Sequence, residues 1–176
     1  MQVNARAARG LVVRRAQIDD AVQVADVLLA SRRAFLPYAV SPHSEAEIRA
    51  WVRDFVFANE EVFAALMDGL VVGMMSIRRS AIDDPTFDGL NQMYVHPAHV
   101  NQGIGSALLA MALKNVRDAL RLFTFQQNTA ARRFYERHGF KAIAFSDGRD
   151  NEERCPDVLY EFNARCLRIE LSKAPT

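Results

Sequence analysis

The chain has 176 residues and a net charge of +1, from 22 Lys and Arg against 21 Asp and Glu, and half of its residues are hydrophobic. This composition excludes a disordered chain, and the length predicts one compact domain whose core needs no disulfide or structural metal. The near-neutral charge argues against a nucleic-acid or anionic-membrane partner. Two cysteines and the short apolar runs are what we expect of a soluble cytoplasmic protein.

A strand at 11–16 and a helix capped by Asp19 or Asp20 are the first predicted elements. Apolar residues at helical spacing should form the buried stripe of this helix: Val22, Ala25 and Leu29. Residues 1–10 are expected to be a flexible arm outside a domain that covers residues 11–176.

Ser44 and Glu47 have the spacing of a capping box, which predicts the start of a second helix. Its apolar residues should share one buried face: Ile48, Trp51, Val52 and Phe55. Two β-prone runs, 61–67 and 70–77, are joined by Asp68-Gly69, which is typical of a tight hairpin turn.

After a polar loop at 83–85, strands and helices alternate along the chain. Strands are predicted at 90–95, 120–125, 141–145 and 157–162, and helices at 103–116 and 128–138. Residues expected to point inward from the first of these helices are Ile104, Leu108, Met111 and Ala112. The whole pattern predicts an α/β (α+β) fold with a mixed sheet of six to seven strands, flanked by about four helices.

The segment from Met93 to Ser106 carries the first chemical signal. It runs from a strand, through a turn that contains Gly103 and Gly105, into a helix. Unpaired N–H groups and the helix dipole favour an anion at such a helix start, and glycines let a ligand approach the backbone. The segment therefore predicts a phosphate or pyrophosphate site, although a tight turn whose glycines serve packing fits this motif equally well.

Two common phosphate motifs do not fit this segment. A dinucleotide fingerprint needs glycine where Leu108 stands, and a P-loop needs a lysine directly after Gly105.

A second motif lies between Gln127 and Phe140 and reads N-x-x-A-x-x-F-Y-x-x-x-G-F. With the glycine turn before it, in this order and separation, the sequence resembles the GNAT superfamily of acetyl-CoA-dependent N-acetyltransferases over residues 11–162. The resemblance implies a single GNAT-like domain and an acyltransferase with acetyl-CoA as acetyl donor. It also implies direct attack of a primary amine on the thioester, without a metal.

The resemblance also implies roles for individual residues. The backbone of Met93, Tyr94 and Val95 would hydrogen-bond the pantetheine arm, and a backbone N–H near Tyr94 or Val95 would stabilise the oxyanion. The turn and helix start would hold the pyrophosphate of coenzyme A: Val100, Asn101, Gln102, Gly103, Ile104, Gly105 and Ser106.

In the second motif, Asn128 and Ala131 would border the cofactor arm. Tyr135 would be the general acid for the departing thiolate, with a buried core tyrosine as the alternative interpretation. Asn128 and Tyr135 are seven residues apart, which places both on one face of a helix independently of any family.

Four positions depart from the family pattern, and two of them, Asn101 and Gln102, stand where glycine and a basic residue are common. Val100 stands where Gln or Arg is usual, so a polar or charged phosphate contact is lost. Asn91 stands where relatives carry a glutamate base, and an amide cannot accept a proton at neutral pH. Asp88, at the start of the same strand, is the candidate replacement, with an ordinary loop residue as the alternative.

Several questions stay open at this level. The departures motivate a first alternative function, a degenerate acyl-CoA-binding module that acts as a sensor or partner domain. A second alternative is a protein that binds a different phosphate ligand. The acceptor, a small-molecule or peptide amine, is not set by the sequence, and residues 35–38 fit either its pocket wall or the core. A homodimer is compatible with the resemblance. Three arginines should form a solvated helix face, or one of them should reach the 3′-phosphate of coenzyme A: Arg132, Arg133 and Arg137.

Overall fold

The computed structural model describes residues 10–80, 87–114, 116 and 118–164. In this part of the chain seven strands form one sheet in the order β1-β2-β3-β4-β5-β7-β6. Their bounds are β1 Val12–Arg15, β2 Glu61–Met67, β3 Leu70–Arg78, β4 Asp88–Val95, β5 Ala119–Phe125, β6 Lys141–Ser146 and β7 Asp157–Asn163. All neighbouring strands are antiparallel except β4 and β5, which are parallel. The predicted mixed sheet is confirmed.

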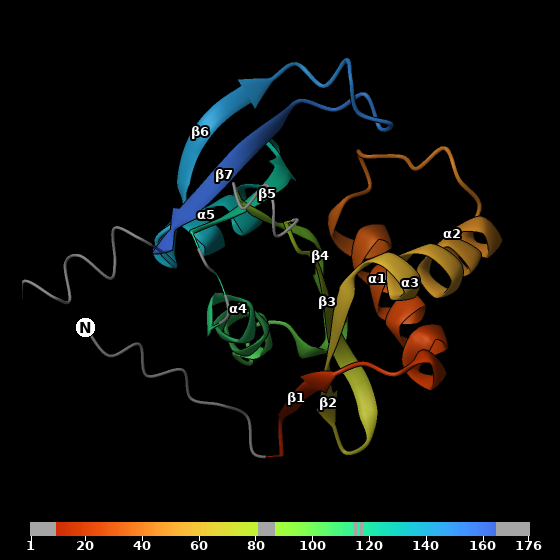
Figure 1. Cartoon of the computed structure of the whole chain (residues 1–176). Helices are drawn as coiled ribbons and strands as arrows, with labels where there is room; N and C mark the ends of the chain where they lie inside the picture. Colours follow the sequence, from red (N-terminus) through yellow and green to blue (C-terminus); the bar gives the residue numbers. More distant parts are fainter. Residues whose placement is uncertain (1–9, 81–86, 115, 117, 165–176) are drawn as a thin grey trace, which may run out of the picture.

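Helices cover both faces of the sheet (Figure 1). They are α1 Ala21–Phe35, α2 Glu45–Trp51, α3 Phe57–Asn59, α4 Ile104–Lys114 and α5 Thr129–Arg137, with the short helical turns η1 Ile18–Asp20, η2 Val52–Val56 and η3 Pro97–His99. No helix in the described ranges is long and apolar enough to cross a bilayer. The predicted arm, apart from Gly10, the loop at 83–85 and residues 165–176 lie outside those ranges.

The sheet separates two hydrophobic clusters. Successive residues of β3 face opposite sides, as the pleat requires, so Met74 packs with α1 and η2 while Met75 packs with α4 and α5. Gly73 lets α4 approach the sheet closely, because a Cβ atom there would lie 2.7 Å from Cγ2 of Ile104. This contact places the start of α4 beside the end of β4, where Val95 pairs with Gly73.

Local signals in the sequence are confirmed by the structure. Ser44 accepts from the Glu47 N–H group and Glu47 accepts from the Ser44 N–H group, which completes the predicted capping box of α2. Asp68 and Gly69 have φ angles of 50° and 80°, the left-handed pair that a two-residue hairpin turn requires.

Predictions about which helix faces are buried are wrong in part. Val22 is 68% exposed, whereas Ala25 and Leu29 are buried. The second helix changes at Val52 into the π-helical turn η2, and the wider turn leaves Trp51 and Phe55 exposed. Their rings stack on each other with centroids 6.4 Å apart.

Asp20 stands at the N-terminus of α1, but its side chain does not cap that helix. Its carboxylate accepts two hydrogen bonds from Arg14, at 2.7 and 2.9 Å, and one from the Gln17 N–H group at 2.8 Å. Hydrogen bonds from Arg14 hold the pKa of Asp20 below its usual value. The residue therefore ties β1 to η1 rather than opening α1.

The parallel strands β4 and β5 diverge, and this opening positions the site. They pair only through Asp88–Leu120 and Gly89–Arg121. Further along, β4 has one additional residue, Asn91, between the partners of Ser76 and Ile77 in β3. An extra residue of this kind bends its strand and changes the direction of the side chains next to it. Because β4 bends after Gly89, the two strands separate and leave a space between them.

Candidate active site

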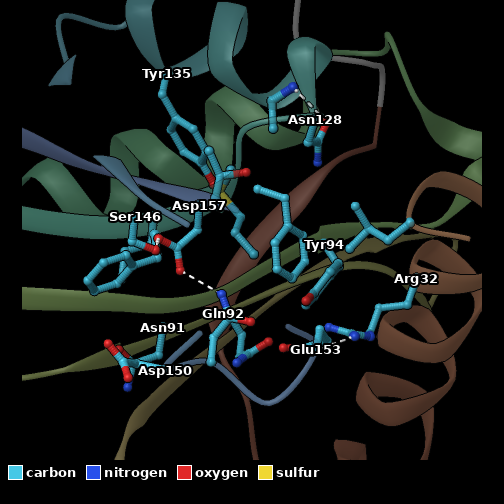
Figure 2. Close-up of a pocket in the computed structure, with 18 residues that line it drawn as sticks. Arg32, Asn91, Gln92, Tyr94, Asn128, Tyr135, Ser146, Asp150, Glu153 and Asp157 are labelled. Carbon is cyan, nitrogen blue, oxygen red and sulfur yellow. Dashed lines mark hydrogen bonds and ion pairs between the residues drawn. The ribbon is translucent and has the colours of Figure 1, made fainter. Parts of the chain in front are cut away.

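A cavity of about 610 Å³ lies between the separated strands (Figure 2). Its walls come from five parts of the chain: α1, β4, β5, the start and face of α5, and the segment that joins β6 to β7. The lining residues are Arg32, Leu36, Leu90, Asn91, Gln92, Met93, Tyr94, Phe123, Thr124, Phe125, Asn128, Ala131, Tyr135, Ser146, Asp150, Asn151, Glu153 and Asp157. Residues far apart in the sequence therefore meet around one space.

The structure brings together five of the predicted site residues in this cavity. They come from β4 and from α5: Met93, Tyr94, Asn128, Ala131 and Tyr135. About half of the backbone N–H and C=O groups of a strand point to each of its neighbours, and β4 has no partner on the β5 side beyond Gly89. Its backbone can thus bond an extended ligand along that edge.

Asn128 begins α5 and faces the cavity. Its Oδ1 atom accepts a hydrogen bond of 3.1 Å from the Ala131 N–H group, so it caps the helix. One helical face then carries Asn128, Ala131 and Tyr135 toward the same space. The asparagine of the motif has a structural role in addition to any contact with a ligand.

Tyr135 lines the cavity although its residue is only 7% exposed. Its ring packs edge-on against Phe140, with centroids 5.6 Å apart. Burial raises the pKa of the Tyr135 phenol far above its ordinary value, and the nearby Tyr94 raises it further. The phenol is therefore a neutral hydrogen-bond donor at all physiological pH values.

The glycine turn adopts the backbone conformation that its sequence indicates, but it does not line the cavity. Asn101 and Gly103 have φ angles of 62° and 82°, and α4 begins one residue later than predicted, at Ile104. Gly105 lies against the ring of Phe134, which a Cβ atom at this position would approach to 3.4 Å. Ser106 bonds the Nε2 atom of His138 at 3.1 Å, a partner that the sequence did not indicate.

Asp88 is the one predicted catalytic residue that the structure places away from the cavity. It is 4% exposed, its carboxylate forms an ion pair of 2.8 Å with Arg79, and it accepts from the Ser80 N–H group at 3.0 Å. It lies where β4 and β5 are still paired, so the closed end of the sheet separates it from the opening. This geometry does not support Asp88 as the general base, because its carboxylate does not line the cavity.

One further expectation needs correction, and the pocket-wall alternative for residues 35–38 is met in part. Arg132 is not part of a solvated face, because it donates to the Tyr160 hydroxyl at 3.2 Å and to the Gln126 carbonyl at 3.3 Å. In the segment 35–38, an aliphatic residue, Leu36, lines the cavity, while Tyr38 packs edge-on against Phe125 in the wall.

The segment between β6 and β7 supplies residues that the sequence did not identify. It carries Asp150, Asn151 and Glu153 to the cavity, and Ser146 and Asp157 flank it on the two strands. None of these residues belongs to a recognisable motif. Only the antiparallel pairing of β6 with β7, and of β7 with β5, brings them beside Tyr135.

A second cavity, of about 740 Å³, adjoins the first. It lies between α1, α2 and the β6–β7 segment, and Leu28, Ile48 and Trp51 are among its apolar walls. Both cavities share Arg32, Gln92, Asp150, Asn151 and Glu153. The shared wall makes them two parts of one site.

Comparison with known proteins agrees with this architecture. Residues 58–142 match the family model for the acetyltransferase (GNAT) domain. No curated protein sequence matches the chain. An acetyltransferase of the GNAT family from Bacillus cereus has 15% sequence identity and a TM-score of 0.67 over 87% of this chain and 96% of that one.

Two similar structures contain coenzyme A or acetyl-CoA. PaiA N-acetyltransferase from Thermoplasma acidophilum, in complex with coenzyme A, has 20% identity and a TM-score of 0.64 over 87% of this chain and 98% of its own. YncA from Salmonella typhimurium, a putative acetyltransferase with its cofactor acetyl-CoA, has 18% identity and a TM-score of 0.67 over 87% of this chain and 93% of its own. These identities are evidence of a shared fold. Residues 58–142 therefore carry an acetyltransferase (GNAT) domain, and the chain has the same fold as these GNAT-family structures.

Proposed function

We propose that the protein transfers the acetyl group of acetyl-CoA to a primary amine. The observation that carries the proposal is the single cavity at which the free edge of β4, Asn128 and Tyr135 meet. The similar folds that hold coenzyme A and acetyl-CoA support the choice of donor.

The residues present fit an extended acyl thioester with a pyrophosphate. The unpaired edge of β4 at Met93 and Tyr94 offers backbone groups to an amide-containing arm. The left-handed residues Asn101 and Gly103 shape the turn before α4, whose first N–H groups suit a phosphate. Backbone donors do the binding here, so Val100 in place of a polar or charged side chain reduces the affinity without removing the site.

Acetyl-CoA would supply the activated acetyl group, and residues of the chain would orient it and donate or accept the protons of the reaction. Tyr135 is buried, neutral and directed into the cavity, so its hydroxyl can donate to a sulfur atom that gains negative charge. Its high pKa favours a hydrogen bond to the departing sulfur over an early, complete proton transfer.

The second cavity is the natural place for the acceptor. No residue of α5 lines it, yet it shares Arg32 of α1 and Gln92 of β4 with the first cavity. Its volume of about 740 Å³ suits a small molecule or the end of a peptide chain.

A direct test combines binding with turnover. Wild-type protein should show a thermal shift with acetyl-CoA and should release free thiol with at least one member of a panel of primary amines. Tyr135→Phe should keep the thermal shift and lose about 10²-fold or more in kcat.

Tyr38→Phe is the matched control, because its hydroxyl is buried without a hydrogen-bond partner among the described residues. Wild-type turnover by Tyr135→Phe would exclude the acid role. Acetyl-CoA binding without turnover of any amine would support the alternative function as an acyl-CoA-binding module. A thermal shift with another nucleotide but not with acetyl-CoA would support a protein that binds a different phosphate ligand.

A further inference from the structure

The reaction proposed above needs a group that takes a proton from the acceptor amine. The nitrogen becomes positively charged as its bond to the acetyl carbon forms, and it must lose a proton to become an amide. The titratable residues that line the cavity are Arg32, Tyr94, Tyr135, Asp150, Glu153 and Asp157. Arginine and tyrosine hold their protons at neutral pH, which leaves three carboxylates.

These carboxylates differ in their partners. Glu153 forms an ion pair of 2.7 Å with Arg32, so its charge is already matched. Asp150 is exposed to solvent on the β6–β7 segment. The hydrogen bonds of the Asp157 carboxylate come from neutral groups, 2.6 Å from Ser146 Oγ and 2.9 Å from Asn151 Nδ2. The carboxylate has further acceptor sites, since each of its oxygens can accept two hydrogen bonds.

The two partners of Asp157 are themselves held in place. Asn151 donates to the Cys155 carbonyl at 2.7 Å and accepts from the Cys155 N–H group at 3.1 Å. Ser146 Oγ accepts from the Gly148 N–H group at 3.1 Å. The carboxylate is thus fixed by side chains that the β6–β7 segment itself orients.

The backbone of Asp157 is equally well positioned. It begins β7, between Phe125 of β5 and Ser146 of β6. Gln126 Nε2 donates to the Asp157 carbonyl at 2.9 Å and to the Ser146 carbonyl at 2.8 Å. Figure 2 shows the side chains of Asp157 and Tyr135 in the same cavity, one from the sheet and one from α5.

We infer that Asp157 is the proton acceptor for the amine in the proposed acetyl transfer. The N–C bond forms, and the nitrogen proton passes to the Asp157 carboxylate. The C–S bond breaks, and the sulfur takes the proton that Tyr135 donates. Asp157 then returns one proton to solvent and Tyr135 regains one, so that the products are the amide and the free thiol. This inference rests on the proposed function.

The test is the isosteric variant Asp157→Asn, assayed with whichever amine the wild type uses. The expected result is a loss of about 10²- to 10⁴-fold in kcat/KM with the acetyl-CoA thermal shift unchanged. The remaining rate should increase with pH, because solvent base must then take the proton from the nitrogen. The defect should also be smaller for a weakly basic amine. Asp157→Glu, which keeps a carboxylate, should retain more activity and the pH profile of the wild type.

Asp147→Asn is the matched control in the same segment, because this carboxylate pairs with Arg149 at 2.9 Å and is mostly exposed. Its rate should equal that of the wild type. If Asp157→Asn does not fold, Ser146→Ala replaces it. Loss of one donor disfavours the charged carboxylate, so the acidic limb of the rate profile should move to higher pH.

Two outcomes distinguish this inference from the function beneath it. If the wild type is active and Asp157→Asn is equally active with an unchanged pH profile, only the role of Asp157 is overturned. The same holds if the acidic limb of the rate profile does not move in Ser146→Ala. A wild type that turns over no amine overturns the proposed function and the inference with it.

Discussion

Arg32 of α1 and Glu153 of the β6–β7 segment form an ion pair of 2.7 Å across 121 residues of sequence. Their side chains are only 18% and 17% exposed, and both line the two adjoining cavities. Arg32 also donates to the Ala39 carbonyl at 3.3 Å, and Tyr94 lies beside its guanidinium (Figure 2). The pair thus connects the helix on one side of the site with the segment that closes the other side.

A double-mutant cycle should detect this connection. Removing one partner leaves the other charge partly buried, so Arg32→Met and Glu153→Gln should each reduce the free energy of unfolding. The coupling energy in urea titrations should be about 1–2 kcal/mol. The exposed pair Asp147–Arg149 is the control and should give no measurable coupling. A zero coupling for Arg32–Glu153 would show that the segment is held by its other contacts.

Acceptor preference should follow the charge of the cavity walls. Arg32 is the cation on the walls, and the carboxylates there are Glu47, Asp150, Glu152, Glu153 and Asp157. Among amines of equal size, one with a second positive charge should have a KM about 10-fold lower than one with a carboxylate, because like charges repel. The difference should shrink in 0.5 M salt. A preference for the carboxylate-bearing amine would assign Arg32 to substrate binding instead.

Gly148→Ala should destabilise the protein and weaken acceptor binding. The residue has a φ angle of 81°, and a Cβ atom there would lie 2.2 Å from the Cys155 carbonyl carbon. The segment that carries Asn151 and Glu153 must therefore shift, at a cost of about 2–4 kcal/mol in the free energy of unfolding.

Gly69→Ala is the matched control for that substitution. Its φ angle of 80° is almost the same, but no atom lies within 4 Å of the added Cβ. It should cost only the backbone strain, about 1 kcal/mol. Equal losses for the two variants in urea titrations would show that the close contact of Gly148 with Cys155 is unimportant.

Tyr135 should make the folded state sensitive to alkaline pH. Burial raises its pKa in the folded state, whereas in the unfolded chain it ionises at about pH 10. The unfolded state therefore binds fewer protons above this pH, and stability is lost as pH increases beyond about 10. Tyr135→Phe should show a smaller loss between pH 9 and pH 11 in denaturant titrations. Parallel curves for both proteins would contradict this linkage.

Local patterns along the chain predicted much of the fold. The capping box of Ser44 and Glu47 and the turn at Asp68-Gly69 depend on a few consecutive residues, and both are present. The spacing of Asn128 and Tyr135 likewise predicted a shared helical face. Val22 was misjudged because helical periodicity gives the spacing of a stripe but not how far the sheet extends beneath it. Trp51 and Phe55 were misjudged because the helix becomes π-helical at Val52, which regular helical spacing does not predict.

The sequence by itself determined the order of the strands and helices, the glycine turn and the helix that carries Tyr135, because short-range sterics and hydrogen bonds specify them. The tertiary structure alone decided which carboxylates face the site. Asp88 lies beside the cavity-lining stretch of β4 in sequence, yet the closed end of the sheet buries it against Arg79. Asp157, with no motif around it, reaches the cavity because β7 is inserted between β5 and β6. Long-range strand pairing, which no local pattern encodes, assembles that side of the site.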